Sequence, residues 1–490
     1  MAVADESRQL DWSTFEARVA ALAGRLRATG VGPGDRVAVL LPNRTALLEI
    51  LFGTTRVGAI FLPINLRLSP REIAFQLDDS RPSTLFYESD LQDTVDRTLA
   101  RSRHRPRHVW AVAGDPDPYE EELNSAEGVS KCVQVSPEHP AILMYTSGTT
   151  GVPKGALLPH RKSLYNSLNA AEYFANGGGD RVLVVAPLFH SLGLQILAVP
   201  MIHAGGTLLL QRQFDPERVW DAVEQERITY LGGVPNMYQR LEDTLAENPP
   251  DRWQHEDLRF AFTAGSAVSP ELIRAFGARG IRLQQGYGQT ETSILTCLSA
   301  DEAQTRAGSV GRPVSFAEVR VVDRKDNPGD PASWRDTRPT ETGEIIVRGH
   351  CVMKGYLNNP EATAEAIRGG WFHTGDIGHF DEDGYLFIVD RLKDMIIRGG
   401  FNVYPRELEE VLITHPDVSL VAVVGVPDDE YGEEIKAFVV AKPNHQVDGD
   451  ALIEWSKSRL AAYKYPRQVE VRESLPMNAT GKILKKELRG

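Results

Sequence analysis

The clearest group of chemically capable residues is the segment 145–155, which reads Tyr-Thr-Ser-Gly-Thr-Thr-Gly-Val-Pro-Lys-Gly. It follows an apolar run at 141–144 that predicts a buried β-strand. Glycines and small hydroxyl residues let backbone N–H groups approach phosphate oxygens, and Lys154 adds a positive charge. The P-loop spacing is absent, because Lys154 precedes a glycine instead of following one. The segment therefore predicts a phosphate-binding loop of another type.

Four further short motifs follow this loop in order along the chain. They are Tyr-Gly-Gln-Thr-Glu at 287–291, Trp-Phe-His-Thr-Gly-Asp at 371–376, Asp-Arg-Leu-Lys-Asp at 390–394, and a terminal motif at 476–484 that contains Lys482. Together the five motifs resemble the signatures of the adenylate-forming superfamily, which contains acyl-CoA synthetases, coumarate:CoA ligases, beetle luciferases and peptide-synthetase adenylation domains. The spelling that begins at Asp390 is most similar to bacterial fatty-acid CoA ligases.

The resemblance implies two successive reactions of a carboxylic acid. A carboxylate oxygen attacks the α-phosphorus of ATP, which forms an acyl-AMP and releases pyrophosphate, and the thiol of CoA then takes the acyl group. Two anions must meet in the first step, so positive groups and hydrogen-bond donors must converge on the phosphate. The residues implied as catalytic are Lys482, Thr146, Glu291 and His190, and Glu291 is implied to hold Mg²⁺. ATP, Mg²⁺ and CoA are the implied cofactor set.

The resemblance also assigns the nucleotide contacts. The loop is implied to hold the β- and γ-phosphates, Asp376 the ribose hydroxyls with help from Arg391, and Tyr287 the adenine against 265–267. Taken alone, Tyr287 could be a core residue and Asp376 a turn residue. The full expected nucleotide set is Thr146, Ser147, Gly148, Thr149, Thr150, Gly151, Lys154, Gly265, Ser266, Ala267, Tyr287, Gly288, Thr290, Asp376, Arg391 and Lys482.

His190 lies in the segment 187–193, which bears on the acid substrate. Amino-acid-adenylating relatives typically carry an Asp at this place to pair the substrate ammonium group, and the histidine removes that counter-ion. A structural histidine at a helix start is an equally good interpretation of His190. By analogy, the expected pocket residues are His190, Gln195, Val234, Gly286, Thr292 and Thr296.

The second reaction requires space for a thiol where Lys482 and pyrophosphate would otherwise lie. The resemblance implies that the small terminal domain rotates about a hinge at Asp390, with Lys393 nearby and Gly399 and Gly400 presented to the CoA channel.

The elements that must position these residues follow an alternating pattern. From residue 35 to about 284, β-branched or Leu-rich runs alternate with helical patterns such as 216–226 and 270–278, which predicts βαβ units with parallel strands. Short strands between Gly/Asp/Pro turns predict a β-rich subdomain at about 308–389. The expected fold is therefore α/β, with a large domain at 1–389 and a small mobile α+β domain at 390–490.

Composition narrows the class of protein. The 490 residues carry 54 Lys and Arg against 67 Asp and Glu, a net charge of −13 that disfavours nucleic acid as a partner. The 3 cysteines contain no C-x-x-C pair, and no stretch is apolar and long enough for a transmembrane segment or signal peptide. A cytoplasmic enzyme is expected.

The resulting prediction is an AMP-forming acyl-CoA synthetase. A medium- or long-chain fatty acid is the first choice of substrate, and an aryl or specialised biosynthetic acid is the alternative. Loading of a carrier protein and formation of a homodimer are left open. A non-catalytic nucleotide sensor is disfavoured, because Lys482, Glu291 and Asp376 are all present.

Overall fold

The computed structural model describes residues 1–114, 117–146, 152–265, 268–303, 305–306, 308–323, 333–477 and 483–489. The chain forms two compact units, Met1–Val319 with Val347–Phe372, and Arg320–Ile346 with His373–Gly490. The chain therefore passes from one unit to the other three times. Each unit is described by itself below, and the domain boundary expected at residue 390 stays a prediction.

The larger sheet of the first unit contains nine strands within the described residues. Its order is β15 (Arg312–Pro313), β14 (Ser293–Leu298), β13 (Leu283–Gln289), β12 (Phe260–Thr263), β11 (Tyr230–Gly233), β9 (Arg181–Val184), β10 (Thr207–Leu210), β1 (Val3–Ala4) and β2 (Gln9–Leu10). From β13 to β1 all neighbours are parallel. Their apolar runs are buried, as expected for a sheet covered on both faces.

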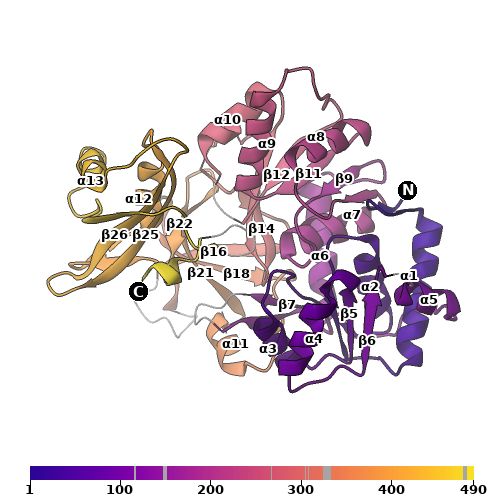
Figure 1. The fold of residues 1–490 in the computed structure, drawn as a ribbon. Helices are drawn as coiled ribbons and strands as arrows, with labels where there is room; N and C mark the ends of the chain where they lie inside the picture. The colour runs from indigo at the N-terminus through magenta and orange to yellow at the C-terminus, as the bar shows by residue number, and fades with distance from the viewer. Residues whose placement is uncertain are drawn as a thin grey trace. The chain divides into compact units, whose positions relative to one another are not determined.

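Helices connect the parallel strands of this sheet, as Figure 1 shows. They are α7 (Val199–Ala204), α8 (Pro216–Gln225), α9 (Pro235–Glu247) and α10 (Pro270–Ala278), and α6 (His160–Tyr173) leads from β8 of the second sheet to β9. Proline stands at the start of α8, α9 and α10, where its missing N–H costs nothing. The helices expected at 216–226 and 270–278 are therefore confirmed.

The second sheet of the first unit carries the phosphate-loop segment. Its order is β19 (Gly355–Tyr356), β8 (Lys154–Pro159), β7 (Pro140–Thr146), β4 (Ile60–Pro63), β3 (Arg36–Leu40), β5 (Thr84–Glu88) and β6 (His108–Val112). From β7 to β6 the strands are parallel, whereas β8 is antiparallel to β7 and β19 is antiparallel to β8. The helices of this part are α1 (Trp12–Ala28), α2 (Thr45–Arg56), α3 (Pro70–Ser80), α4 (Gln92–Arg101), α5 (Pro118–Ser125) and α11 (Pro360–Ala366).

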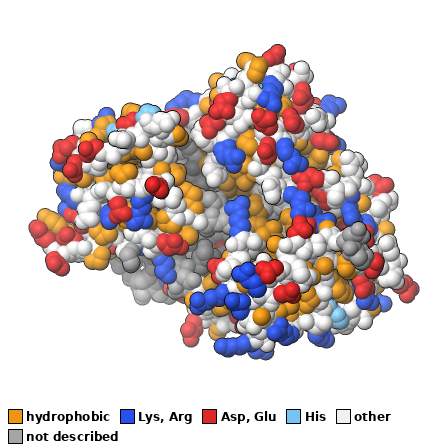
Figure 2. All heavy atoms as spheres, in the orientation of Figure 1, with side chains coloured by type: hydrophobic (Ala, Val, Ile, Leu, Met, Phe, Trp, Pro, Cys, Tyr) orange, Lys and Arg blue, Asp and Glu red, His pale blue; other side chains and the backbone are white. Residues whose placement is uncertain are grey.

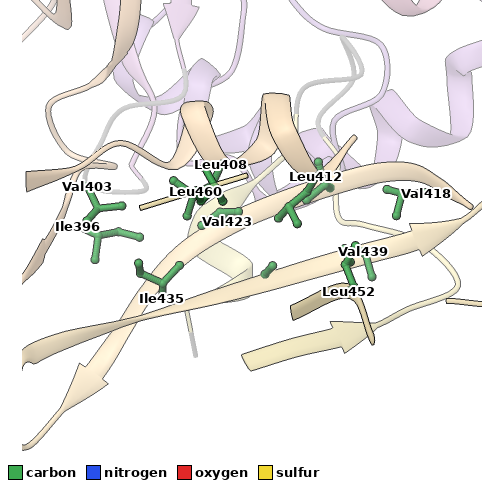
Figure 3. Packing of buried hydrophobic residues seen from close by; sticks show 12 residues of the cluster. Ile396, Val403, Leu408, Leu412, Val418, Val423, Ile435, Val439, Leu452 and Leu460 are labelled. Atoms are coloured by element: carbon green, nitrogen blue, oxygen red, sulfur yellow. The ribbon is translucent and has the colours of Figure 1, made fainter. Parts of the chain in front are cut away.

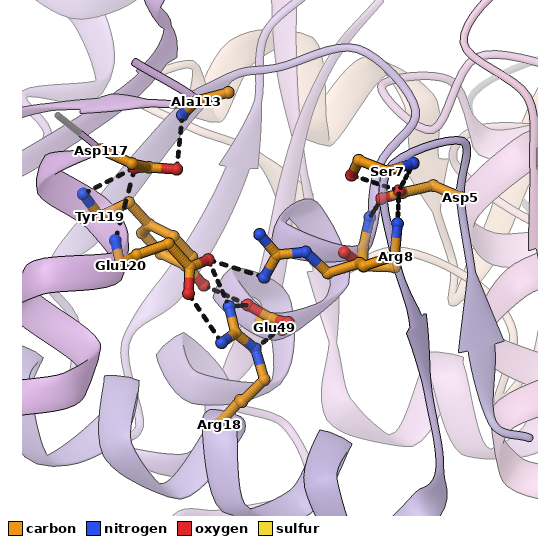
Figure 4. Close-up of polar contacts among 10 residues, drawn as sticks. Asp5, Ser7, Arg8, Arg18, Glu49, Ala113, Asp117, Tyr119 and Glu120 are labelled. Atoms are coloured by element: carbon orange, nitrogen blue, oxygen red, sulfur yellow. Dashed lines mark hydrogen bonds and ion pairs between the residues drawn. The ribbon is translucent and has the colours of Figure 1, made fainter. Parts of the chain in front are cut away.

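A buried ionic network joins three of these helices (Figure 4). Glu49 of α2 is fully buried and accepts hydrogen bonds from Arg18 Nε at 2.7 Å and from the Tyr119 hydroxyl at 2.6 Å. Arg18 of α1 also donates to Glu120 of α5. Burial by itself lowers the pKa of Arg18, but the hydrogen bonds to Glu120 and Glu49 outweigh it and raise the pKa overall. The network therefore joins α1, α2 and α5 through a buried carboxylate group that accepts hydrogen bonds from Arg18 and Tyr119.

The second unit contains strands of two further sheets. One has the order β17 (Arg335–Asp336), β16 (Ala317–Asp323), β18 (Gly343–Gly349), β21 (Trp371–Phe380) and β20 (Ile367–Arg368), and β22 (Leu386–Arg391) pairs with β21. The other has the order β24 (Phe401–Val403), β23 (Ile396–Arg398), β26 (Gly432–Ala441) and β25 (Val418–Asp428), and β27 (Gln468–Val471) pairs with β26.

Helices α12 (Pro405–Leu412) and α13 (Gly449–Lys457) accompany the second of these sheets. Figure 3 shows that Leu408 and Leu412 on α12 lie against the sheet that carries Val423 and Val439. Each of these four side chains is fully buried. This apolar cluster gives the end of the chain a core of its own.

One predicted helix has an unexpected geometry. The stretch expected as a helix at 192–203 begins with a π-helical segment, η2 (Leu192–Ala198), and only then continues as α7. Gly193 allows this segment to pack closely against the backbone of residues 186–187. A Cβ at this residue would meet the carbonyl oxygens of Pro187 at 2.5 Å and Ala186 at 2.6 Å. π-Helical turns are rare and often lie at functional sites.

Acidic and basic side chains are interspersed over the face drawn in Figure 2. Lys and Arg gather along its lower edge, near α3 and α4. Exposed arginines on and beside α3 and α4 are Arg67, Arg71, Arg81, Arg97, Arg101, Arg103, Arg105 and Arg107. The acidic net charge of the chain is therefore unevenly distributed.

Candidate active site

Glu291 forms the centre of a hydroxyl-lined site in the first unit. Its side chain is 7% exposed, and its Oε1 accepts hydrogen bonds from Thr146 Oγ1 at 3.3 Å and from the Tyr356 hydroxyl at 3.0 Å. Lys154 Nζ lies 5.4 Å from the centroid of the Tyr356 ring. The structure thus brings together Thr146, Lys154 and Glu291, three residues predicted from separate motifs.

The strand pairing explains this convergence. Thr146 ends β7 and Lys154 begins β8, and the two residues are directly paired across the antiparallel ladder. Tyr356 on β19 pairs with Ala156 on β8, and the Met353 N–H donates to the Glu291 carbonyl at 2.7 Å. The loop between β7 and β8 is therefore a hairpin connection with both ends fixed beside Glu291. Its residues Ser147, Gly148, Thr149, Thr150 and Gly151 lie outside the described residues.

Tyr356 is a site residue that the sequence reasoning missed. Burial and the neighbouring Glu291 raise the pKa of its hydroxyl, so the phenol stays protonated and donates to the carboxylate. No motif marks this tyrosine, because it reaches Glu291 only through the pairing of β19 with β8.

The donor set around Glu291 fits a hard divalent cation. Mg²⁺ is usually bound through one or two carboxylates together with water and substrate phosphates, rather than by a dedicated protein cage. Glu291 supplies one carboxylate, and no cluster of three or more His, Cys, Asp or Glu side chains is found among the described residues. Mg²⁺ at this carboxylate would neutralise phosphate charge next to Thr146 and Lys154.

The described residues of the expected adenine site lie on β13 and directly after β12. Tyr287 on β13 is half-buried and pairs with Thr296 on β14. A Cβ at Gly288 would meet the Ser293 carbonyl oxygen at 1.8 Å, so the turn that carries Thr290 and Glu291 requires this glycine. Gly265 follows β12 with φ +93°, and Ser266 and Ala267 lie outside the described residues.

A buried lysine on α6 supports the turn after Glu291. The Lys162 side chain is fully buried, and its Nζ donates to Ser293 Oγ. Ser293 has φ +58°, an unfavourable backbone conformation for a residue with a Cβ. Burial lowers the pKa of Lys162 to about 8, although Cys351 and Glu291 oppose the shift. No sequence motif marks Lys162, and a lysine on a helix is ordinarily exposed.

The expected pocket residues divide into two groups. Gln195, Thr292 and Thr296 are fully buried, and Thr296 donates to the Val310 carbonyl oxygen at 2.7 Å. Gly286 lies where a Cβ would meet the Phe262 ring at 2.9 Å, so its small size serves close packing.

The other two expected pocket residues are near-surface. His190 is half-buried and precedes η2, and its Nδ1 accepts from the Leu192 N–H at 3.4 Å. Val234 precedes α9, with its Cγ1 3.9 Å from the place of a Cβ at Gly265. The acid-binding roles of all six residues stay predictions.

The second unit carries the expected ribose and hinge residues. Asp376 on β21 is 3% exposed, pairs with Arg391 on β22, and forms an ion pair with Arg391 Nε at 3.1 Å. Asp390 is buried and accepts from the Arg391 and Arg406 N–H groups at 2.6 Å and 2.8 Å, so it links β22 to the start of α12. Burial raises the pKa of Asp390 and lowers that of Lys393.

Two expected CoA-channel residues form the turn of a β-hairpin. Gly399 and Gly400 join β23 to β24 with φ values of +55° and +82°, a conformation that favours glycine at both positions. Lys482 lies outside the described residues. No helix in the described part of the chain is both long and apolar enough to span a bilayer.

Comparison with known proteins gives two family matches that together cover most of the chain. Residues 1–357 match the AMP-binding enzyme model, and residues 407–482 match the AMP-binding enzyme C-terminal domain. The solved structure of ATP-bound MatB from Rhodopseudomonas palustris superposes with a TM-score of 0.90 at 29% identity, covering 100% of this chain and 95% of that chain. The expected α/β fold is thereby confirmed.

Several curated CoA ligases are similar over nearly their full length. A feruloyl-CoA synthase of Amycolatopsis sp is 42% identical, and an indoleacetate–CoA ligase of Aromatoleum aromaticum is 39% identical, each over 98% of this chain and 93% of the relative. A long-chain-fatty-acid–CoA ligase of Mycobacterium tuberculosis is 37% identical over 96% of this chain and 92% of the relative. The chain therefore belongs to the AMP-binding enzyme family and is an AMP-forming acid–thiol ligase.

Proposed function

We propose that this enzyme activates an aromatic carboxylic acid and transfers its acyl group to CoA. The observation that carries this proposal is the higher identity to the feruloyl- and indoleacetate-activating relatives, 42% and 39%, than to the long-chain fatty-acid ligase, 37%. The aryl alternative stated from the sequence is therefore better supported than a fatty acid.

The described residues support the first half-reaction in distinct ways. The acid carboxylate forms a P–O bond to the α-phosphorus as the bond to pyrophosphate breaks. Thr146 and Lys154 are paired across β7 and β8, so the Thr146 hydroxyl and the Lys154 ammonium group lie at the two ends of the segment implied to bind phosphate. Glu291 would hold Mg²⁺, and Tyr356 orients that carboxylate.

In the second half-reaction the CoA sulfur attacks the acyl carbon, and AMP leaves with the bonding electrons. We assign Gly399 and Gly400 to the CoA channel and Asp390 to the hinge, as the resemblance implies. Asp390 suits a hinge because its carboxylate bridges the last strand residue, Arg391, and the first turn of α12.

A substrate screen tests the proposal. Pyrophosphate exchange into ATP is measured with cinnamic, benzoic and indolic acids and with fatty acids of eight to eighteen carbons, and CoA or a phosphopantetheinylated carrier protein is then offered to the adenylate. We expect the highest kcat/KM for an aromatic acid and transfer to CoA. A fatty acid at the top of the series would contradict the aromatic assignment, and transfer to the carrier alone would contradict the acceptor.

A further inference from the structure

The hairpin that carries Glu291 ends in a residue with a strained backbone. Gln289 at the end of β13 pairs with Ser293 at the start of β14, and Glu291 lies in the short connection between them. Tight hairpin connections often require a left-handed residue, for which glycine is the usual choice. Here Ser293 adopts φ +58°, a conformation that is unfavourable for a residue with a Cβ. The serine side chain therefore needs a physical explanation.

Lys162 on α6 provides that explanation. Its Nζ donates a hydrogen bond to Ser293 Oγ, a contact that a glycine at this position cannot make. Both side chains are buried, with exposed fractions of 0% for Lys162 and 1% for Ser293. The hydrogen bond therefore fixes the strained residue of the hairpin against α6.

A lysine is an unfavourable choice if this contact serves stability alone. Within the part of the chain that the structure describes, Lys162 forms no ion pair with a carboxylate group. A buried ammonium group with a neutral partner destabilises a fold, and an apolar side chain of similar length avoids that cost. The lysine is better explained by what the hairpin does than by the stability of the hairpin.

The hairpin presents Glu291 to several donors at once. Thr146 and Tyr356 donate to its carboxylate, and the Met353 N–H donates to its backbone carbonyl oxygen. Ser293 follows Glu291 by two residues, so its backbone conformation helps to set the direction of the Glu291 side chain. A change of conformation at Ser293 would therefore move the carboxylate away from these donors.

We propose that Lys162 is a positioning residue for adenylate formation, whose hydrogen bond to Ser293 holds the hairpin so that Glu291 faces the cation and the phosphates. This inference rests on the proposed role of Glu291 in holding Mg²⁺, and it is independent of the identity of the acid. Lys162 acts through Ser293, and it is not itself a catalytic residue.

Position and charge predict opposite results for Mg²⁺ in Lys162→Met. If the lysine acts through its charge alone, the variant has less positive charge near Glu291 and should bind Mg²⁺ more tightly. If the lysine acts through its hydrogen bond, the variant misplaces the carboxylate and should bind Mg²⁺ more weakly, because a small misplacement is enough to weaken a positioned group.

Calorimetric titration with ATP measures this effect without turnover. Titrations of the full chain in Mg²⁺ and in EDTA, with no acid present, give the gain in ATP affinity that Mg²⁺ provides. We expect Lys162→Met to reduce this gain at least about fivefold, with the affinity in EDTA within about twofold of wild type. In pyrophosphate exchange, kcat should fall at least about tenfold while KM for the acid stays within about twofold. The urea midpoint should not fall, which separates positioning from a structural role.

Variants of Ser293 test the same contact from its other side. Ser293→Ala removes the acceptor and keeps the strained backbone, so it should reproduce the losses of Lys162→Met. In the double variant of Lys162→Met with Ser293→Gly, glycine adopts the left-handed conformation unaided, and both readouts should return to within about threefold of wild type. Lys162→Met with Ala175→Gly is the matched control. Ala175 is exposed after α6 with φ +51°, so relief of strain there should restore neither readout.

The outcomes separate this inference from the proposed function. An unchanged or larger Mg²⁺ gain in Lys162→Met, or a loss that Ser293→Gly does not restore, would overturn the positioning role. Should Lys162→Met fail to fold, Ser293→Ala decides by the same two measurements. If Glu291→Gln keeps the full Mg²⁺ gain, the assignment of Mg²⁺ to Glu291 is wrong, and the positioning role is wrong with it. If Glu291→Gln loses the gain and Lys162→Met keeps it, only the positioning role is wrong.

Discussion

Glu291 is a carboxylate whose nearest partners are neutral hydroxyl groups. Hydroxyl donors orient a carboxylate without neutralising it, so its charge stays available to a cation. The hydroxyl of Tyr356 is the shorter of the two contacts and comes from a strand more than sixty residues further along the chain. At the scale of the residue, the hydrogen bond from Tyr356 orients the Glu291 carboxylate.

Tyr356→Phe removes that hydrogen bond while keeping the ring. A hydrogen bond to a charged group contributes about 1.5–3 kcal/mol, so we expect kcat/KM in pyrophosphate exchange to fall roughly tenfold or more and the Mg²⁺ requirement to rise. Tyr165→Phe is the control, because Tyr165 stacks on His350 at 4.1 Å and does not contact Glu291. Equal kinetics for Tyr356→Phe and wild type would disprove the support role.

Lys162 makes folding stability depend on pH in a definite direction. Burial lowers its pKa from the ordinary lysine value of 10.5 to about 8 in the folded chain, so between these pH values the unfolded chain binds more protons. The free-energy cost of burying the charged amine is therefore absent above pH 10.5. This cost increases as the pH falls from 10.5 to 8, and it is complete below pH 8, so the folded chain is less stable there.

Lys162→Met should remove this dependence. At pH 7 the variant should gain roughly 2–3 kcal/mol from loss of the buried cation, less the value of the Ser293 hydrogen bond. The advantage over wild type should shrink between pH 8 and 10.5. Urea unfolding of both proteins at pH 7, 8.5 and 10 measures this difference, and a constant offset across the series would contradict the shifted pKa.

At the scale of the element, the apolar pattern of η2 predicts that a helix forms but not that the helix begins as a π-helix. The apolar run 192–203 predicts a helix, and a helix is found. Its π-helical start depends on the packing of Gly193 against two backbone carbonyl groups, which no periodicity encodes. The sequence analysis names Gln195 as a pocket residue, but its complete burial within this π-helical segment is evident only from the structure.

Gly193→Ala tests the packing of this element. The added methyl group would meet two backbone oxygens, so we expect a loss of about 1–3 kcal/mol in stability and a clear fall in kcat/KM for the acid. Gly179→Ala is the control, because nothing lies within 4 Å of a Cβ at that residue. Thermal unfolding and pyrophosphate exchange are compared, and a silent Gly193→Ala would show that η2 can relax.

Much of the site could be predicted because short motifs carry local chemistry. The phosphate loop, with Thr146 and Lys154, is predicted from residue type, Glu291 is implied by the family resemblance, and the structure brings the three residues together. Tyr356 and Lys162 could not be predicted, because Tyr356 reaches Glu291 through strand pairing and Lys162 reaches Ser293 through burial. A lysine on a helix is ordinarily exposed, so its burial is the information that the sequence lacks.

At the scale of the whole molecule, the motifs divide between two units. The phosphate loop and Glu291 belong to the first, and Asp376, Asp390 and the segment of Lys482 belong to the second. The family resemblance gives Lys482 a role in adenylate formation alone, so a substitution of this lysine should affect one half-reaction and not the other.

Lys482→Ala should nearly abolish formation of the adenylate while leaving the transfer of a supplied acyl-AMP to CoA largely intact. The reason is electrostatic, since this lysine is implied to offset charge as two anions meet, a requirement that the thiol step lacks. Pyrophosphate exchange and CoA-dependent consumption of synthetic acyl-AMP are the two assays. An equal fall in both would refute the role.

The triple passage of the chain between units has a consequence for gene exchange. A recombination break at 319–320 would transfer residues 347–372 together with the second unit, and with them β19 and Tyr356, the partner of Glu291. A crossover at that point would therefore separate the Glu291 carboxylate from the tyrosine that donates a hydrogen bond to it. Beyond Asp390 the chain does not return to the first unit, so crossovers there would exchange terminal segments without dividing the carboxylate site.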